Sequence, residues 1–104
     1  MGWSKAEGLA DMWEGEMRAC RVAGMRLLII KQAGAVRAYA DRCAHLGMPL
    51  SEGRFRDGVI TCRSHEFTYD AATGSGINPG NVRLQPFAAK CEEGEIWVDL
   101  GTEA

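Results

Sequence analysis

Apolar and polar residues alternate in short stretches along the chain, and glycine-containing pairs interrupt them repeatedly. Such turn-forming stretches lie at residues 23–24, 33–34, 57–58, 73–76, 78–81 and 93–94. Alternation with a period of two, over about four to eight residues, is typical of a β-strand with one buried face. Many short strands separated by closely spaced turns predict an all-β protein, an antiparallel sandwich or barrel.

The pattern predicts strands at residues 3–6, 16–22, 26–32, 36–40, 59–61, 67–69, 82–90 and 95–100. The last strand alternates most clearly, because Ile96, Val98 and Leu100 share one face and Trp97 lies on the other. Residues 27–30 are apolar on both faces, which indicates a central strand. Pro86 cannot donate a backbone hydrogen bond, so it predicts an edge or a bulge within its strand.

Composition narrows the class of protein. A chain of 104 residues with no visible linker is expected to form one domain, residues 1–104. Twelve basic and fourteen acidic residues, a formal charge of -2, argue against nucleic-acid binding. No run approaches the roughly 18 apolar residues of a membrane helix, and the first residues lack a secretory signal pattern. We therefore expect a cytoplasmic monomer without membrane contact, in which Cys20 and Cys91 are buried free thiols.

The other two cysteines each have a histidine close by in the sequence. One residue separates Cys43 from His45, two separate Cys62 from His65, and sixteen lie between the pairs. These are the only histidines of the chain, and structural disulfides are rare in the cytoplasm. The two pairs therefore predict a four-ligand metal site, in a small subdomain (residues 41–70) inserted between strands of the main sheet.

Two kinds of metal centre fit this set of ligands. Two histidines can replace two cysteines on one iron of a [2Fe–2S] cluster. The charges of two ferric ions, two sulfides and two thiolates then cancel, so the cluster accepts an electron at roughly −150 to +300 mV. A Cys2His2 zinc site in a structural module is the alternative. Zinc sites usually pair like residues, whereas each pair here is mixed.

The full pattern of ligand types, inner spacings and intervening length resembles that of Rieske iron–sulfur proteins. The resemblance implies the Rieske fold and one [2Fe–2S] cluster. Carried over to this sequence, Cys43 and Cys62 would bind the inner iron, and His45 and His65 the outer iron. It also implies an electron-transfer protein that does not turn over a substrate by itself.

Residues around the ligands indicate which Rieske proteins are most similar. Respiratory members join the two loops by a disulfide, but this chain has Met48 and Ser64 at those positions, and Phe67 where they have a serine. The chain therefore resembles the soluble, low-potential Rieske ferredoxins. Those ferredoxins usually have phenylalanine at the position of Tyr69. We hypothesise that the Tyr69 hydroxyl reaches Cys43 and modestly raises the potential; simple packing in the sheet is the alternative.

Four stretches, residues 11–17, 51–53, 58–63 and 73–79, resemble the Rieske ferredoxin of toluene monooxygenases. The resemblance implies electron transfer from an NADH-dependent flavin and iron–sulfur reductase to a diiron hydroxylase that oxidises an aromatic compound. Ferredoxins of aromatic-ring dioxygenases are the nearest alternative, and a subunit of a nitrite-reductase-type assembly is another. The implied docking surface comprises Leu46, Gly47, Met48, Pro49, Glu66, Phe67, Ile77, Asn78 and Pro79.

Overall fold

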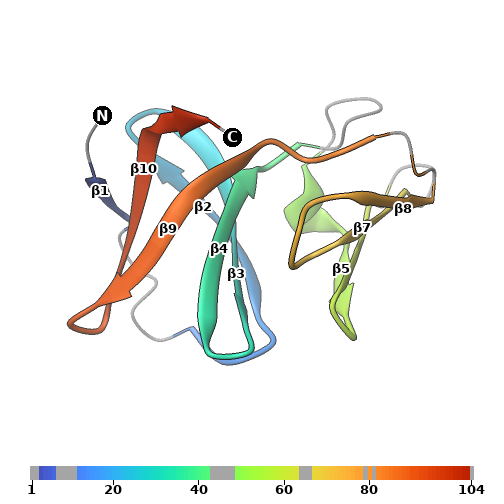
Figure 1. Ribbon diagram of the computed structural model, residues 1–104, viewed down its shortest axis with the longest axis horizontal. Helices are drawn as coiled ribbons and strands as arrows, with labels where there is room; N and C mark the ends of the chain where they lie inside the picture. Colours follow the sequence, from blue (N-terminus) through green and yellow to red (C-terminus); the bar gives the residue numbers. More distant parts are fainter. Residues whose placement is uncertain are drawn as a thin grey trace.

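The computed structural model describes residues 3–6, 12–42, 49–63, 67–78, 80 and 82–103, which form two antiparallel sheets side by side (Figure 1). This confirms the predicted all-β fold. The strands are β1 (Trp3–Ala6), β2 (Met17–Val22), β3 (Met25–Gln32), β4 (Ala35–Ala40), β5 (Arg54–Arg56), β6 (Val59–Thr61), β7 (Thr68–Asp70), β8 (Gly76–Asn78), β9 (Pro86–Glu92) and β10 (Glu95–Glu103). One 3-10 turn, η1 (Leu50–Glu52), precedes β5. The described residues contain no helix that could span a membrane.

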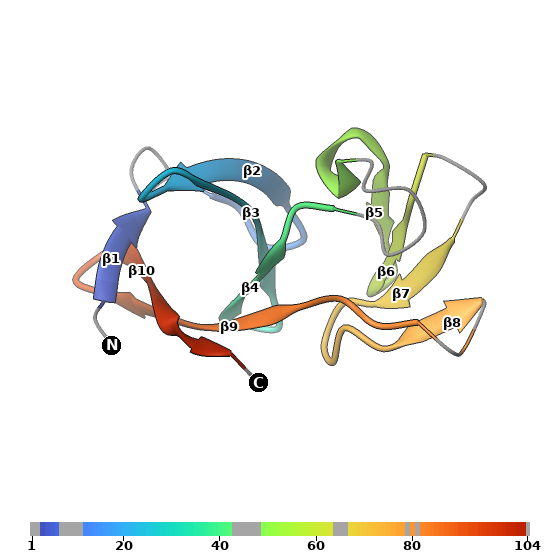
Figure 2. The same cartoon turned by 90° about the horizontal axis from the view of Figure 1, so that it is seen from above.

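The larger sheet has six strands in the order β1-β10-β9-β4-β3-β2. It curls until its two edge strands, β1 and β2, approach each other, so that it forms a barrel when seen from above (Figure 2). The smaller sheet has the order β5-β6-β7-β8 and lies beside the barrel. The chain leaves the barrel after β4 and returns to it at β9, so the smaller sheet is an insertion between two neighbouring strands.

Strand β3 contributes to both hydrophobic cores. Leu27 and Ile29 face the barrel interior, whereas Leu28 and Ile30 face the core shared with the smaller sheet; all four are fully buried. This confirms the predicted central strand and explains its apolar run, since each face packs against a different core. The core between the sheets consists of Leu28, Ile30, Tyr39, Leu50, Ile60, Cys62, Tyr69, Ala71 and Leu84.

Four two-residue hairpin turns have the same backbone conformation. In each, a non-glycine residue with φ of 52–55° precedes a glycine with positive φ, which is the type I′ turn that matches the twist of antiparallel strands. The non-glycine residues are Ala23, Ala33, Asp57 and Glu93. The turns therefore fix the register of the strands that they join.

The β3–β4 turn also binds a side chain from outside the hairpin. The N–H groups of Gly34 and Ala33 donate to the Glu14 carboxylate and hold its pKa below the usual value.

Three local predictions need correction. The strand predicted at residues 82–90 begins only at Pro86, where the missing N–H is tolerated, and β9 lies inside the sheet between β10 and β4. Gly76 and Asn78, expected to lie in the turns 73–76 and 78–81, belong to the strand β8, because the chain reverses after Asp70 and pairs with β7. The prediction that Cys91 is buried is wrong, and Cys20 is only half-buried. Cys91 is the next-to-last residue of β9, close to the turn with β10, and is not part of the barrel core.

Candidate metal centre

Cys62 follows directly on strand β6 and is fully buried. Side chains alternate along a strand, so Cys62 lies on the same side as Ile60, in the core beside Leu50 and Tyr69. The backbone N–H of Cys62 donates to the carbonyl oxygen of Phe67 at 2.7 Å. This bond ties the chain together on both sides of residues 64–66. The second predicted ligand segment therefore begins and ends at one place in the fold.

The first predicted ligand segment is held in a similar way at its described ends. Asp41 follows β4 and is buried. Its carboxylate accepts hydrogen bonds from the N–H and the hydroxyl of Ser51, both at 2.8 Å, and from Nε of Arg26 at 2.9 Å. Residue 41 is thus bonded to residue 51. The first ligand segment therefore starts and ends at neighbouring residues in the fold, Asp41 and Ser51, as the second ligand segment does between Cys62 and Phe67.

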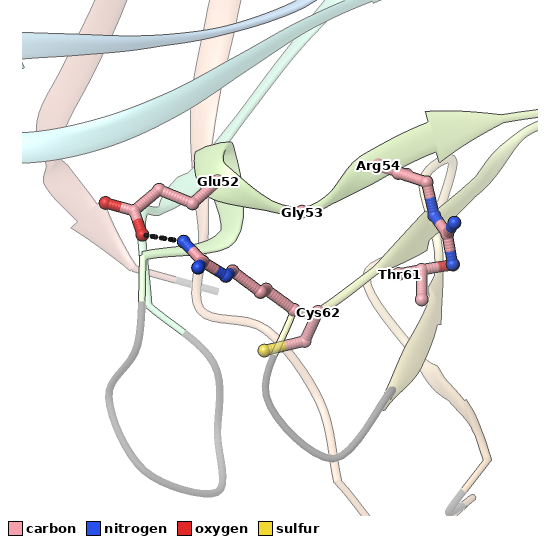
Figure 3. Close-up of a pocket in the computed structure, with 6 residues that line it drawn as sticks. Glu52, Gly53, Arg54, Thr61 and Cys62 are labelled. Carbon is pink, nitrogen blue, oxygen red and sulfur yellow. Dashed lines mark ion pairs between the residues drawn. The ribbon is translucent and has the colours of Figure 1, made fainter.

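The residues that follow the first segment contact the residues that precede the second segment at Gly53. A Cβ atom on Gly53 would lie 2.0 Å from the carbonyl oxygen of Thr61 and 3.2 Å from the backbone nitrogen of Arg63. Glu52 Oε1 and Arg63 Nη1 form an ion pair of 3.5 Å across the same contact, the dashed line in Figure 3. Glu52, Gly53, Arg54, Thr61, Cys62 and Arg63 line a pocket of about 290 Å3 there. In Figure 3 the sulfur of Cys62 points away from the side chain of Arg54.

The structure describes only part of the predicted site. Cys43, His45 and His65 lie outside the described residues, as do the predicted docking residues Leu46, Gly47, Met48, Glu66 and Pro79. Pro49 and Phe67 are half-buried, Asn78 is exposed and Ile77 is 52% exposed. Within the described ranges, no three Cys, His, Asp or Glu side chains gather in a way that could hold a metal ion. The described part of the chain therefore offers no competing metal site.

Tyr69 lies in the middle of β7 and is fully buried. It is opposite Ile60 of β6 and Gly76 of β8, and its ring belongs to the core between the sheets. Its ring therefore has the packing role that we considered as the alternative. Whether its hydroxyl also reaches Cys43 stays a prediction, since Cys43 is not among the described residues.

A thiolate at Cys62 would need a positively charged partner. An anionic sulfur among aliphatic and aromatic side chains is costly unless a positive partner neutralises it, and an iron ion would do so. No sequence pattern indicated that Asp41, Ser51 and Gly53 hold the two ligand segments in place. A lone aspartate, serine or glycine gives no local signal, because its partners are distant in the sequence.

Comparison with known proteins identifies the kind of domain. Residues 2–88 match the family model of the Rieske [2Fe-2S] domain. The ferredoxin component of the alkene monooxygenase system of Xanthobacter autotrophicus is 40% identical over 94 residues, which cover 89% of this chain and 75% of that protein. The ferredoxin component of biphenyl 2,3-dioxygenase from Rhodococcus jostii is 31% identical over 101 residues, 96% of this chain and 94% of that protein. Among solved structures, a chain of the complex of reduced oxygenase and oxidised ferredoxin in carbazole 1,9a-dioxygenase superimposes with a TM-score of 0.84 at 31% identity, covering 98% of this chain and 95% of that one.

Proposed function

The chain belongs to the Rieske [2Fe-2S] domain family, and on this basis we propose that it is the ferredoxin component of a multicomponent oxygenase. In this role it receives one electron from an NADH-dependent reductase containing a flavin and an iron–sulfur cluster. It then passes the electron to the diiron hydroxylase of an aromatic, toluene-type monooxygenase. The chain itself carries the electron and leaves the oxidation of the substrate to the hydroxylase. We expect it to act as a monomer in the cytoplasm.

The observation that supports this proposal best is the match of residues 2–88 to the Rieske [2Fe-2S] domain, together with the 40% identical ferredoxin component, and the contact at Gly53 agrees with it. This contact places Cys62 beside the described ends of the segment that contains Cys43 and His45. We propose that these residues and His65 hold the cluster, within a subdomain of residues 41–70. When bound, the cluster supplies a site that accepts and releases a single electron.

The protein side of the site serves to exclude water and to keep its shape. Leu50, Ile60 and Tyr69 are fully buried around Cys62, so they keep water away from its sulfur. The hydrogen bonds at Asp41 and Cys62 and the close contact at Gly53 hold both segments against the sheet. A site whose protein surroundings move little suits an electron carrier, because little structural reorganisation accompanies each electron transfer.

The relatives support a monooxygenase more than a dioxygenase as the partner. The 40% identical relative serves an alkene monooxygenase system, whereas the ferredoxins of biphenyl and naphthalene dioxygenase systems are 31% and 26% identical. The stretches that resemble the ferredoxin of toluene monooxygenases favour an aromatic substrate, and the Xanthobacter relative adds an alkene as the alternative. A dioxygenase partner is the second candidate.

We further propose that the partner docks on the apolar edge beside the cluster site. Pro49 and Phe67 are half-buried there, and Ile77 of the edge strand β8 is 52% exposed. The remaining members of this edge are Leu46, Met48 and Pro79, as the resemblance implies. A small apolar contact suits a transient electron-transfer complex. I77D should slow electron transfer to the hydroxylase, whereas W13D, at an exposed residue that precedes strand β2 of the barrel, should not.

Spectroscopy of the purified holoprotein tests the cofactor. We expect two irons and two sulfides per chain, and a rhombic EPR signal after reduction with an average g below that of all-cysteine clusters. C62S should lose the signal, whereas C91S, at an exposed cysteine, should keep it. A colourless protein with one zinc per chain would refute the electron-carrier proposal.

A second assay tests the partner. The reduced holoprotein is mixed with purified diiron hydroxylase and, separately, with a Rieske dioxygenase, and oxidation of the ferredoxin is followed by absorbance. We expect rapid oxidation and hydroxylated product with the monooxygenase component only. Product formation with the dioxygenase alone would transfer the assignment to the second candidate.

A further inference from the structure

Asp41 is a buried carboxylate at the boundary between the barrel and the inserted sheet. Its side chain is fully inaccessible, although aspartate is rarely buried without a reason. The residue stands after the last position of β4, two residues before Cys43 in the sequence. It therefore links the rigid barrel to the segment that carries two of the four proposed ligands.

Both carboxylate oxygens of Asp41 are occupied by donors from elsewhere in the chain. The backbone N–H of Ser51 donates to Oδ1, and the Ser51 hydroxyl and Arg26 Nε both donate to Oδ2. The backbone N–H of Asp41 in turn donates to the carbonyl oxygen of Arg26 at 3.1 Å. Strand β3, the end of β4 and the turn η1 thus converge on one charged group. Charge-assisted hydrogen bonds of this kind are stronger than neutral ones.

The same arrangement extends toward the second ligand segment. Ser51 is followed by Glu52 and Gly53, which contact Arg63 and Thr61 on either side of Cys62. The Glu52–Arg63 ion pair is solvent-exposed and contributes little by itself. Because Asp41 holds η1 against the barrel, it also holds the surface on which the Cys62 segment rests.

We propose that Asp41 is a positioning residue for the metal centre, which with Ser51 forms a clamp across the segment that contains Cys43 and His45. The inference rests on the proposed cluster-binding function and goes beyond it, because it assigns the retention of the cluster to a residue that is not a ligand. Asp41 acts by holding the backbone in place through its hydrogen bonds. The clamp fixes the described ends of the ligand segment, Asp41 and Ser51, to the barrel and to each other.

The substitution D41N tests this proposal, because it keeps the shape of the side chain but cannot keep all of these hydrogen bonds. An amide nitrogen placed at Oδ1 would face the Ser51 N–H, and one placed at Oδ2 would face the Arg26 N–H. Either orientation sets two donors against each other. D99N is the matched control: Asp99 is as buried as Asp41 but lies in β10 of the barrel, between β1 and β9.

The experiment compares wild-type, D41N and D99N holoproteins in three measurements. The first is the rate at which a chelator bleaches the visible absorbance. Loss of a supporting interaction around a metal typically weakens binding by about 10- to 100-fold, so we expect D41N to lose its cluster at least about tenfold faster than D99N. The second is the EPR spectrum of the reduced protein, which should broaden only in D41N. The third is hydrogen exchange of the peptide that contains Ser51, which should accelerate only in D41N.

The possible results distinguish a specific effect of the clamp on the cluster from a general loss of stability, and from a failure of the proposed function. Equal bleaching rates for D41N and D99N would overturn the proposal, even if exchange at Ser51 increased. If D41N does not fold, the pair S51A and S51T replaces it, because threonine keeps the hydroxyl that alanine removes; faster cluster loss in S51A alone supports the clamp, and equal rates refute it. The hydrogen-exchange measurement requires no cluster chemistry or redox partner. It can therefore succeed when the oxygenase assays fail, or fail when they succeed.

Discussion

Replacing Gly53 by alanine should disrupt the contact that brings the two ligand segments together. The added Cβ would lie 2.0 Å from the Thr61 carbonyl oxygen, whereas real Cβ contacts are essentially never shorter than 3.0 Å. Both partners are backbone, so neither can turn aside as a side chain does. The segments must separate by at least 1.0 Å, the difference between those two distances. Because Cys62 follows Thr61, its sulfur would move with this displacement.

The size of the expected effect follows from this displacement. Overpacking of a rigid site costs about 1–3 kcal/mol and sometimes more, and we expect G53A to lie at the upper end, near 3 kcal/mol of unfolding free energy. Metal–ligand distances are held within about 0.2 Å, so a shift of 1.0 Å should also prevent full cluster occupancy. Urea unfolding followed by circular dichroism measures the first effect, and iron and sulfide per chain measure the second.

The matched control is G80A. A Cβ atom on Gly80 would meet nothing closer than 3.9 Å, and neither glycine has the positive φ that disfavours alanine. We expect G80A to unfold within about 0.5 kcal/mol of the wild type, as a surface substitution normally does. If G53A were as stable as G80A and held two irons, the close approach of the segments would not limit the site, and this reasoning would be refuted.

Three further predictions concern single side chains. Y69F should lower the reduction potential while leaving the fold intact, if the hydroxyl donates to a cluster ligand; an unchanged potential in protein-film voltammetry removes that hypothesis. E14Q should make the unfolding free energy depend less on pH in the acid range. The pKa of Glu14 is lower in the folded than in the unfolded protein, so its carboxylate stabilises the fold above the unfolded pKa, and this contribution is lost as pH falls through the folded pKa. Unfolding midpoints between pH 2 and 6 measure this, and parallel curves for both proteins would contradict it. Burial raises the pKa of Tyr39, so the contribution of its neutral hydroxyl to the unfolding free energy should persist below about pH 10 and decrease above it. Y39F should remove this loss of stability at alkaline pH. It should also lower the unfolding free energy by about 0.5–1.5 kcal/mol at neutral pH, because the 2.8 Å hydrogen bond to a backbone carbonyl is lost. A wild-type stability that stays level from pH 9 to 11 would count against the Tyr39 argument.

The sequence alone predicted most of the strands and a metal site made of two cysteines and two histidines. A period of two in hydrophobicity is a local property, so residues 95–100 and the apolar run 27–30 could be recognised without knowledge of their neighbours. The spacing of cysteine and histidine is local as well, and it led to the same family as the match to the Rieske domain model.

Tertiary structure decided everything that depends on pairs of residues distant in the sequence. β3 has two buried faces because two different cores meet on it, and β8 is a strand because β7 lies alongside it. The bond from Asp41 to Ser51 and the contact of Gly53 with Thr61 span eight to ten residues and join separate elements. Such contacts have no periodicity in the sequence. They arise when long-range strand pairing closes loops whose ends come together only in the folded chain.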